Sequence, residues 1–306
     1  MPHYRVTDVD RRPLPDVVRD RRGSRLGYDA DERQRPFAHY FRPRTEPIQT
    51  HVHEALLRGR QPADFGHEVD DAPAKLAGAG YQEMETGWTR TGHGTLIVSC
   101  LTDMPGVTAA MWDWWFGWHL RDSARYKLWH PEAHQRAIVG DDRSGDRDLT
   151  DRERYIDNVS YVDEYVGAKK VRLAIRFVDP TTLGFVNRPG TTHICGRIGV
   201  TYLPVAAGWV IHQVRPTPYG SEMRSRFFMG PGEILALPPA AVSLAAPAAL
   251  LTSRVGKAAS RPIVRTAVRT TLTDTLAHDL LFHCAGEMNH LASFLPDLYD
   301  EFKAMP

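Results

Sequence analysis

The sequence of 306 residues contains little cysteine, little net charge and no long uninterrupted apolar run. Its three cysteines, Cys100, Cys195 and Cys284, lie far apart and form no CxxC pair. This spacing argues against a disulfide framework and against a thiolate zinc site, and it is typical of a reducing compartment. The 38 Lys and Arg residues almost balance 37 Asp and Glu residues, which leaves a net charge of +1. The chain therefore lacks the basic footprint of a dedicated nucleic-acid binder.

The apolar stretches of the chain are too short to indicate export or membrane insertion. The first 25 residues are charged throughout and contain no apolar core, so no secretory signal peptide is expected. Residues 235–251 form the most apolar stretch, but they are mostly alanine and include three prolines, which is unsuited to a spanning helix. We therefore expect a cytoplasmic protein with neither a nucleic acid nor a membrane as its partner.

The apolar content of 42% is that of a globular protein, and its pattern predicts an α+β fold. The apolar run at 95–102 predicts a buried strand. A series of further strands with short connections containing Gly or Pro predicts an antiparallel meander over 158–167, 169–179, 192–203, 208–216 and 221–230. Apolar residues at helical spacing predict a long amphipathic helix over 273–294. We expect a curved antiparallel sheet around this helix, with a cavity between them.

The chain is expected to divide into an irregular N-terminal arm or small subdomain, residues 1–78, and a main domain, residues 79–306. The arm is rich in Arg, Asp and Pro, and a short helix is predicted near 50–60. In the main domain, Asp103 and Pro105 indicate the start of a helix that continues through 107–120. Ser123 is expected to cap a second short helix, which ends before Pro131. The Ala- and Pro-rich segment 235–262 is expected to be a long loop or covering element.

The C-terminal helix carries the first candidate site residues. His283 and Glu287 are four residues apart, so one helical turn places them on the same side. Asp279 and His290 extend this polar stripe along the edge of the buried face. A His and a Glu at this spacing can provide two ligands to one metal. The alternative is a solvated helix face with incidental histidines.

A carboxylate in the strand at 158–167 is the second candidate. Both faces of this strand carry apolar groups, so one of Asp163 and Glu164 is expected to point inward. A buried carboxylate is costly unless it is paired or bound to a metal. Glu164 is therefore a candidate ligand, and the alternative is an exposed or arginine-paired Glu164.

Three histidines and an aromatic helix remain. His212 shares a strand face with valines, a pattern that is also common for an ordinary core histidine. His130 and His134 flank Pro131, and either of them could turn into a cavity or lie in a loop. Residues 112–119 place Trp115 on a helix so rich in indole that it must be deeply packed or form the wall of a pocket for a planar ring.

Several blocks of the sequence, taken together and in order, resemble the diacetylphloroglucinol hydrolase family, which includes phloretin hydrolase. These blocks are MWDWWFGWH at 111–119, RYKLWHPEAH at 125–134, GSEMRSRFF at 220–228 and HCAGEMNHLA at 283–292. The similarity spans roughly 80–230 and 270–295. It implies a START/Bet v 1-like helix-grip fold and hydrolysis of the carbon–carbon bond that joins an acyl group to a phenolic ring.

The resemblance also implies a site. Members of the family hold one zinc ion between two His and two Glu, which fall here on His134, Glu164, His283 and Glu287. His134 is preferred to His130 because the family's frame aligns through the last histidine of its HPEAH block. The resemblance assigns Tyr126 and His212 to the phenolic oxygens and to proton transfer, with Glu164 or Glu287 as the base. A second pocket tyrosine of the family meets Phe227 or Phe228 here, so Phe227 would contact the ring without a hydroxyl. The tryptophan-rich helix would supply Trp115 as an apolar wall for the ring.

Two other classes of protein stay open at this point. A non-catalytic helix-grip protein would bind an aromatic ligand without turnover and without stoichiometric metal. A non-haem iron oxygenase could use the same ligands, because two His and a carboxylate also hold Fe(II). The expected partner in the favoured interpretation is a small aromatic ketone, and a homodimer is left open.

Overall fold

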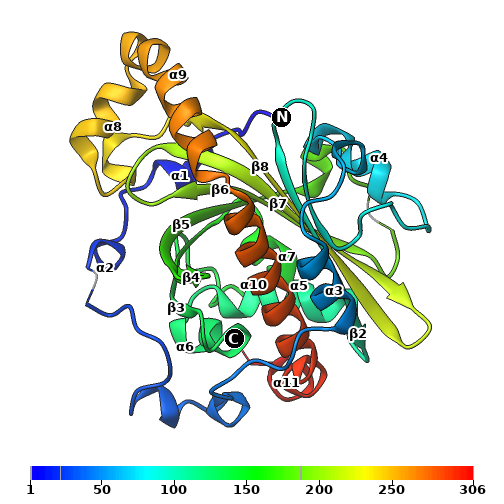
Figure 1. Ribbon diagram of the computed structural model, residues 1–306. Coiled ribbons are helices and arrows are strands. Elements are labelled where there is room, and N and C mark those ends of the chain that lie inside the picture. Colours follow the sequence, from blue (N-terminus) through cyan, green and yellow to red (C-terminus); the bar gives the residue numbers. More distant parts are fainter. Residues whose placement is uncertain (1, 21, 187, 306) are drawn as a thin grey trace.

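The computed structural model describes residues 2–20, 22–186 and 188–305. Within these ranges the chain forms one eight-stranded antiparallel sheet with the order β1-β2-β8-β7-β6-β5-β4-β3 (Figure 1). The strands are β1 Gly87–Arg90, β2 Leu96–Pro105, β3 His134–Val139, β4 Val159–Val166, β5 Lys169–Val178, β6 Thr192–Val200, β7 Val205–Thr217 and β8 Gly220–Ile234. The predicted meander from 158 to 230 is therefore confirmed, with β4 to β8 in consecutive order.

The long helix α10, Asp274–Ala292, lies across the concave side of this sheet (Figure 1). Thr273 caps it, because its side chain accepts a hydrogen bond from the backbone N–H of Leu276, a donor that the helix itself leaves without a partner. The predicted α+β helix-grip arrangement is thus confirmed. The other α-helices of the described ranges are α1 Asp8–Arg11, α2 Asp16–Arg19, α3 Thr50–Arg58, α4 Ala72–Leu76, α5 Ala109–His119, α6 Ser123–Trp129, α7 Asp151–Tyr155, α8 Ala245–Thr252, α9 Arg254–Thr271 and α11 Leu295–Phe302.

Both faces of the sheet are buried, and β7 shows how. Successive side chains of a strand point to opposite faces. Val210 and His212 face the cavity beside α10, while Trp209 and Ile211 pack into a second apolar cluster on the outer face. The first cluster fills the space between the sheet, α5 and α10. A strand covered on both sides explains why the first half of β7, residues 205–211, is a continuous apolar run.

The N-terminal arm contributes to both clusters. Phe37 and Val52 belong to the cluster beneath α10, whereas Val69 and Leu76 belong to the one on the outer face. The helix predicted near 50–60 is α3. The division of the chain into units at residue 78 stays a prediction.

The predicted start of the tryptophan-rich helix is wrong. β2 continues through Asp103 to Pro105, where its pairing with β8 ends. The helix α5 begins at Ala109, and Thr108 caps it by accepting a hydrogen bond from the backbone N–H of Met111. Pro105 is compatible with the last position of a strand, and the Asp103–Pro105 pair resembled a helix start only because the sequence does not reveal where the pairing with β8 stops.

Of the two alternatives for the segment 235–262, a long loop or a covering element, the structure favours the second: most of it from Ala245 on is helical, and it covers part of β8. β8 runs on to Ile234, and the helices α8 and α9 follow it. Gly232 permits the close approach of α9, because a Cβ at this position would lie 2.6 Å from Val268 and 2.9 Å from Val264. Within the described ranges, no helix is both long enough and apolar enough to cross a membrane.

Two buried arginines of β8 depend on one carboxylate. The Nε of Arg224 donates to Glu85 at 3.0 Å, and Arg226 donates to the same carboxylate. Burial disfavours the charged form of Glu85, but the hydrogen bond from Arg224 and the charge of Arg226 outweigh it and lower the pKa of Glu85 to about 2. Glu85 is thus ionised in the folded protein at neutral pH.

We expect Glu85→Ala to lower the free energy of unfolding at pH 7 by about 3–5 kcal/mol, because two buried guanidinium groups lose their partner. The stabilisation that the ionised Glu85 gives the folded state is complete above its ordinary pKa of 4.5. It is lost as the pH falls toward the pKa of about 2 that Glu85 has in the folded protein. Urea unfolding of wild type and variant at pH 7 and pH 3 should therefore show a smaller difference at pH 3. Glu83→Ala, at an exposed carboxylate in the same loop, is the control, and an equal Glu85→Ala effect at both pH values would contradict the ion-pair explanation.

Candidate metal centre and cavity

A cavity of about 340 Å³ lies between the concave side of the sheet, α5, α6 and α10. Its wall is largely apolar, with Val162, Ile175 and Val210 among the strand residues that line it. Five polar residues expected from the sequence line it: Tyr126, Glu164, His212, His283 and Glu287. The other polar side chains in the wall include those of His119, Ser160, Lys169 and Thr271. An apolar cavity with a few convergent polar groups is the usual form of a small-molecule site.

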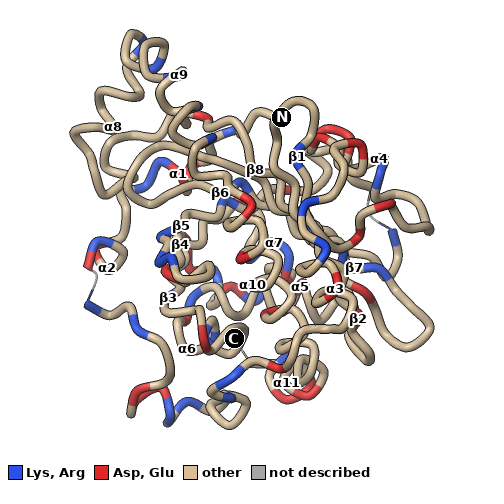
Figure 2. Tube along the Cα trace, in the orientation of Figure 1, with Lys and Arg blue, Asp and Glu red and all other residues tan. Residues whose placement is uncertain are grey.

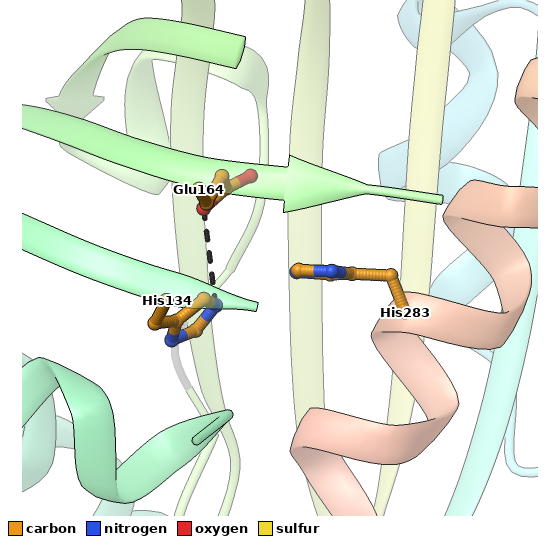
Figure 3. Close-up of side chains that lie close together, drawn as sticks. All are labelled: His134, Glu164 and His283. Carbon is orange, nitrogen blue, oxygen red and sulfur yellow. Dashed lines mark ion pairs between the residues drawn. The ribbon is translucent and has the colours of Figure 1, made fainter. Parts of the chain in front are cut away.

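Three buried side chains from three elements meet beside this cavity (Figure 3). His134 is the first residue of β3, Glu164 lies on β4 and His283 lies on α10. One nitrogen or oxygen of each lies within 4.8 Å of the others. Figure 3 shows the His283 ring pointing toward the space beside the His134–Glu164 pair, whose Nε2 and carboxylate oxygen are 3.8 Å apart.

The chain around Pro131 explains how His134 reaches the cluster. The residue before a proline avoids the helical region, so α6 ends at Trp129 and His130 adopts φ −143° and ψ 85°. The chain turns and enters β3 at His134, whose ring Nδ1 lies 3.1 Å from the carbonyl oxygen of Tyr126. A ring that donates from Nδ1 to a carbonyl leaves Nε2 free of a proton, which is the form that binds a metal.

Strand register brings Glu164 to the same place. The antiparallel pairing of β3 and β4 sets Glu164 directly opposite His134. The hydroxyl of Tyr126 donates a hydrogen bond to the Glu164 carboxylate. The Tyr126 ring also stacks on the His134 ring, with centroids 3.8 Å apart. Tyr126 therefore fixes the orientation of two residues of the cluster.

Glu287 adds a second carboxylate from the next turn of α10. Its carboxylate oxygen lies 3.4 Å from Nε2 of His134 and 3.7 Å from Nε2 of His283. The spacing of four residues between His283 and Glu287 produces this approach. Three of the four residues that the family resemblance names as ligands thus form one compact group, and Glu287 lies beside it, close to both histidines.

Burial controls the protonation of these four groups. It raises the pKa of Glu164 to about 7 and raises the pKa of Glu287 well above its ordinary value. It lowers the pKa of His283 to about 4 and that of His134 well below its ordinary value. No Lys or Arg in the described ranges forms an ion pair with either carboxylate. The cluster therefore lacks a positive charge that a divalent cation would supply.

The donor set and its spacing fit a divalent metal. Nε2 of His134 is buried and makes no hydrogen bond to the described residues. Zinc binds His nitrogen and carboxylate oxygen with bonds of about 2.0–2.1 Å, so ligand atoms of a tetrahedral site lie about 3.3 Å apart. The three His–Glu separations of 3.4, 3.7 and 3.8 Å are close to this value.

His130, the alternative ligand, lies next to the cluster but outside it. The group of three donors that lie within 4.8 Å of one another contains His134, and it contains neither His130 nor Glu287. The His130 ring stacks on that of His283, with centroids 4.8 Å apart. His130 therefore packs against the candidate ligand His283.

Of the side chains expected to contact a substrate ring, His212 and Phe227 line the cavity and Trp115 does not. The rings of His212 and Phe227 meet edge to face with centroids 5.8 Å apart. Phe228 points to the outer face, so Phe227 occupies the position where a pocket tyrosine was expected. Nδ1 of His212 lies 2.8 Å from the Ser225 hydroxyl.

Trp115 does not line the cavity, contrary to expectation. It is fully buried and stacks on His119, with centroids 4.7 Å apart. Phe116, the next residue of α5, lines the cavity in its place. Phe116 could not be predicted, because the orientation of a helix cannot be read from its sequence pattern when nearly every face is apolar.

The fold and the cluster define the class of protein: a helix-grip domain with a buried His and carboxylate site of the metal-binding type. The chain belongs to the family described as "DAPG hydrolase PhiG domain", whose model matches residues 65–300. The family expected from the sequence blocks is therefore confirmed.

Curated relatives agree with this membership. The 2,4-diacetylphloroglucinol hydrolase of a Pseudomonas species is 30% identical over 289 residues, which cover 90% of this chain and 92% of the relative. The enzyme of the same name from Pseudomonas protegens is also 30% identical, over 90% of this chain and 88% of its own length. Phloretin hydrolase of Eubacterium ramulus is 25% identical, over 92% and 95%. Among solved structures, a norcoclaurine synthase of Thalictrum flavum covers 59% of this chain and 99% of its own, at 13% identity and a TM-score of 0.27.

Proposed function

We propose that this protein is a zinc-dependent hydrolase that cleaves the carbon–carbon bond between an acyl group and a phenolic ring of the phloroglucinol type. The observation that carries the proposal is the buried cluster of His134, Glu164 and His283 beside an apolar cavity, in a chain of the DAPG hydrolase family. The relatives are named for 2,4-diacetylphloroglucinol and phloretin, which makes a small aromatic ketone the proposed substrate.

His134, Glu164, His283 and Glu287 would hold the metal. When bound, zinc would supply Lewis-acid polarisation of the acyl carbonyl or a water of lowered pKa. Four protein ligands are typical of a closed structural site, whereas a catalytic site keeps a position open. One carboxylate would therefore have to bind loosely, and Glu164 and Glu287 are the candidates because both line the cavity.

The reaction is a reverse-Claisen hydrolysis. In its keto tautomer an acylphloroglucinol is a β-diketone, because the ring carbon that bears the acyl group is bonded to both the acyl carbonyl and a ring carbonyl. The oxygen of water adds to the acyl carbon, and Glu164 or Glu287 accepts the proton that the water loses. The bond from the acyl carbon to the ring then breaks, its electron pair passes to the ring and its oxygens, and the ring carbon takes up a proton. The products are a carboxylic acid and a ring with hydrogen in place of the acyl group.

Tyr126 and His212 are proposed to handle the phenolic oxygens and the ring proton. Both line the cavity, one at the metal cluster and the other on β7. The Tyr126 hydroxyl already donates a hydrogen bond to the Glu164 carboxylate, so a proton can pass between these two side chains. The apolar wall, including Phe116 and Phe227, excludes water from the rest of the ring.

The test combines metal analysis with an anaerobic assay. We expect purified protein to contain about one zinc per chain and to release a carboxylic acid from 2,4-diacetylphloroglucinol or phloretin without oxygen. Chelator should abolish the activity, and added zinc should restore it. A strict need for oxygen would support an iron oxygenase instead, whereas tight ligand binding without metal or product would support a non-catalytic binding protein.

A further inference from the structure

A helical hairpin formed by α8 and α9 projects from the edge of the sheet (Figure 1). Ser253 separates the two helices and caps α9 by accepting a hydrogen bond from the backbone N–H of Gly256. Val264 and Val268 anchor α9 on β8, where Gly232 leaves room for them. Most of the remaining hairpin is exposed to solvent.

All charged side chains of α9 are positive. Its 18 residues include no Asp or Glu, and Figure 2 shows basic segments of α9 at the edge of the molecule. Spacings of three, four, four and four residues keep the cations along one side of the helix; they are Arg254, Lys257, Arg261, Arg265 and Arg269. Within the described ranges, none of the five forms an ion pair.

Large apolar side chains are exposed on the same hairpin. The exposed fraction is 67% for Leu250, 82% for Val255 and 69% for Ile263, and Leu244 just before α8 is 47% exposed. Scattered exposed apolar residues are normal on a protein surface. Four of them lie on a hairpin whose helix α9 also carries five cations without ion pairs, with Ile263 on the opposite side of α9 from the cations. Apolar and basic groups on different sides of one helix are the combination that an interfacial helix presents to acyl chains and lipid headgroups.

We propose that the α8–α9 hairpin docks this protein on an anionic lipid surface, with Leu250, Val255 and Ile263 in the interface and the cations of α9 at the level of the headgroups. This revises the expectation of no membrane partner, which followed from the lack of a spanning segment. The two findings are compatible because a peripheral helix lies in the plane of the interface and does not cross the bilayer.

Two other occupants fit the hairpin less well. A nucleic acid would match the five cations but would leave the exposed Leu, Val and Ile side chains without a partner, since phosphate contacts are polar. A second copy paired symmetrically through the hairpin would place five cations against five others, because a two-fold interface sets the same patch on both subunits.

The hairpin lies next to the cavity. Thr271, the last residue of α9, and Leu272 both line it, as do Leu276 and Leu280 in the first turns of α10. Docking through the hairpin would hold the cavity near the bilayer, where apolar ketones concentrate. This consequence rests on the proposed function, but the docking itself does not.

The experiment is co-sedimentation of the full chain with vesicles. We expect binding to vesicles of 70% phosphatidylcholine and 30% phosphatidylglycerol at low salt, and little binding to pure phosphatidylcholine or at high salt. The variant R261Q/R265Q/R269Q should bind the anionic vesicles roughly 100-fold more weakly. The variant L250S/V255S/I263S should also bind more weakly but keep its dependence on salt. Hydrolysis of a soluble substrate should be unchanged in both variants.

The control R11Q/R33Q/R58Q removes the same charge from exposed arginines elsewhere and should bind like wild type. Equal weakening by this control would overturn the proposal, because net charge rather than the hairpin would then determine binding. The proposal also fails if wild type ignores the anionic vesicles, if it binds a DNA duplex in preference to them, or if the hairpin variants change only its oligomeric state.

Discussion

Replacing His283 with alanine should remove the bound metal and lower turnover by roughly 10³-fold or more, since a metal supplies several kcal/mol of transition-state stabilisation. His283 contributes one of the three donors that lie within 4.8 Å of one another. Its loss would also leave Glu287 without one of its two histidine neighbours. The measurements are zinc per chain by elemental analysis and kcat on an acylphloroglucinol.

His278→Ala is the matched control for this variant. His278 lies on the same helix but is exposed, with its ring beside Asp279. We expect it to keep both its zinc and its activity. Thermal unfolding of both variants distinguishes loss of the site from loss of the fold. A folded His283→Ala protein with full zinc content and full turnover would exclude the proposed metal centre.

Three of the four candidate ligands could be proposed from local geometry. His283 and Glu287 meet through the period of one helix, and Glu164 points inward because a strand alternates. The sequence could not show that β3 pairs with β4 so that His134 lies opposite Glu164. That contact joins residues thirty positions apart, and only the family resemblance indicated it.

The errors arise where local patterns leave several answers open. On α5 nearly every side chain is apolar, so the pattern could not distinguish Trp115 in the core from Phe116 at the cavity. In residues 235–262 the prolines left a loop and a covering element as alternatives, and the helices α8 and α9 were not predicted. Pro247 lies near the start of α8, where a missing N–H costs little, whereas Pro262 lies inside α9. The packing of α9 on β8 offsets the cost of a proline inside the helix, and the sequence alone does not reveal this packing.

Replacing His212 should separate proton handling from metal binding. We expect His212→Ala to lower kcat by roughly 10²–10⁴-fold, the usual range for loss of a positioned acid–base group, while zinc content stays at the wild-type value. His212 lines the cavity but is outside the metal cluster. Burial lowers its pKa to about 3, so the ring is neutral near pH 7 and acts through hydrogen bonds rather than as a cation.

The contact with Ser225 makes the prediction more specific. Nδ1 of His212 is held by the Ser225 hydroxyl, which leaves Nε2 for a phenolic oxygen. Ser225→Ala should therefore reduce kcat less than His212→Ala does, because the ring remains but its orientation is less restrained. His193→Ala is the control, since His193 is a buried histidine of the neighbouring strand β6 that lies outside this cavity and packs against Phe185. It should change thermal stability and leave kcat intact. Wild-type kcat in a folded, zinc-loaded His212→Ala protein would assign the ring proton to Tyr126, the one other cavity side chain proposed to carry it.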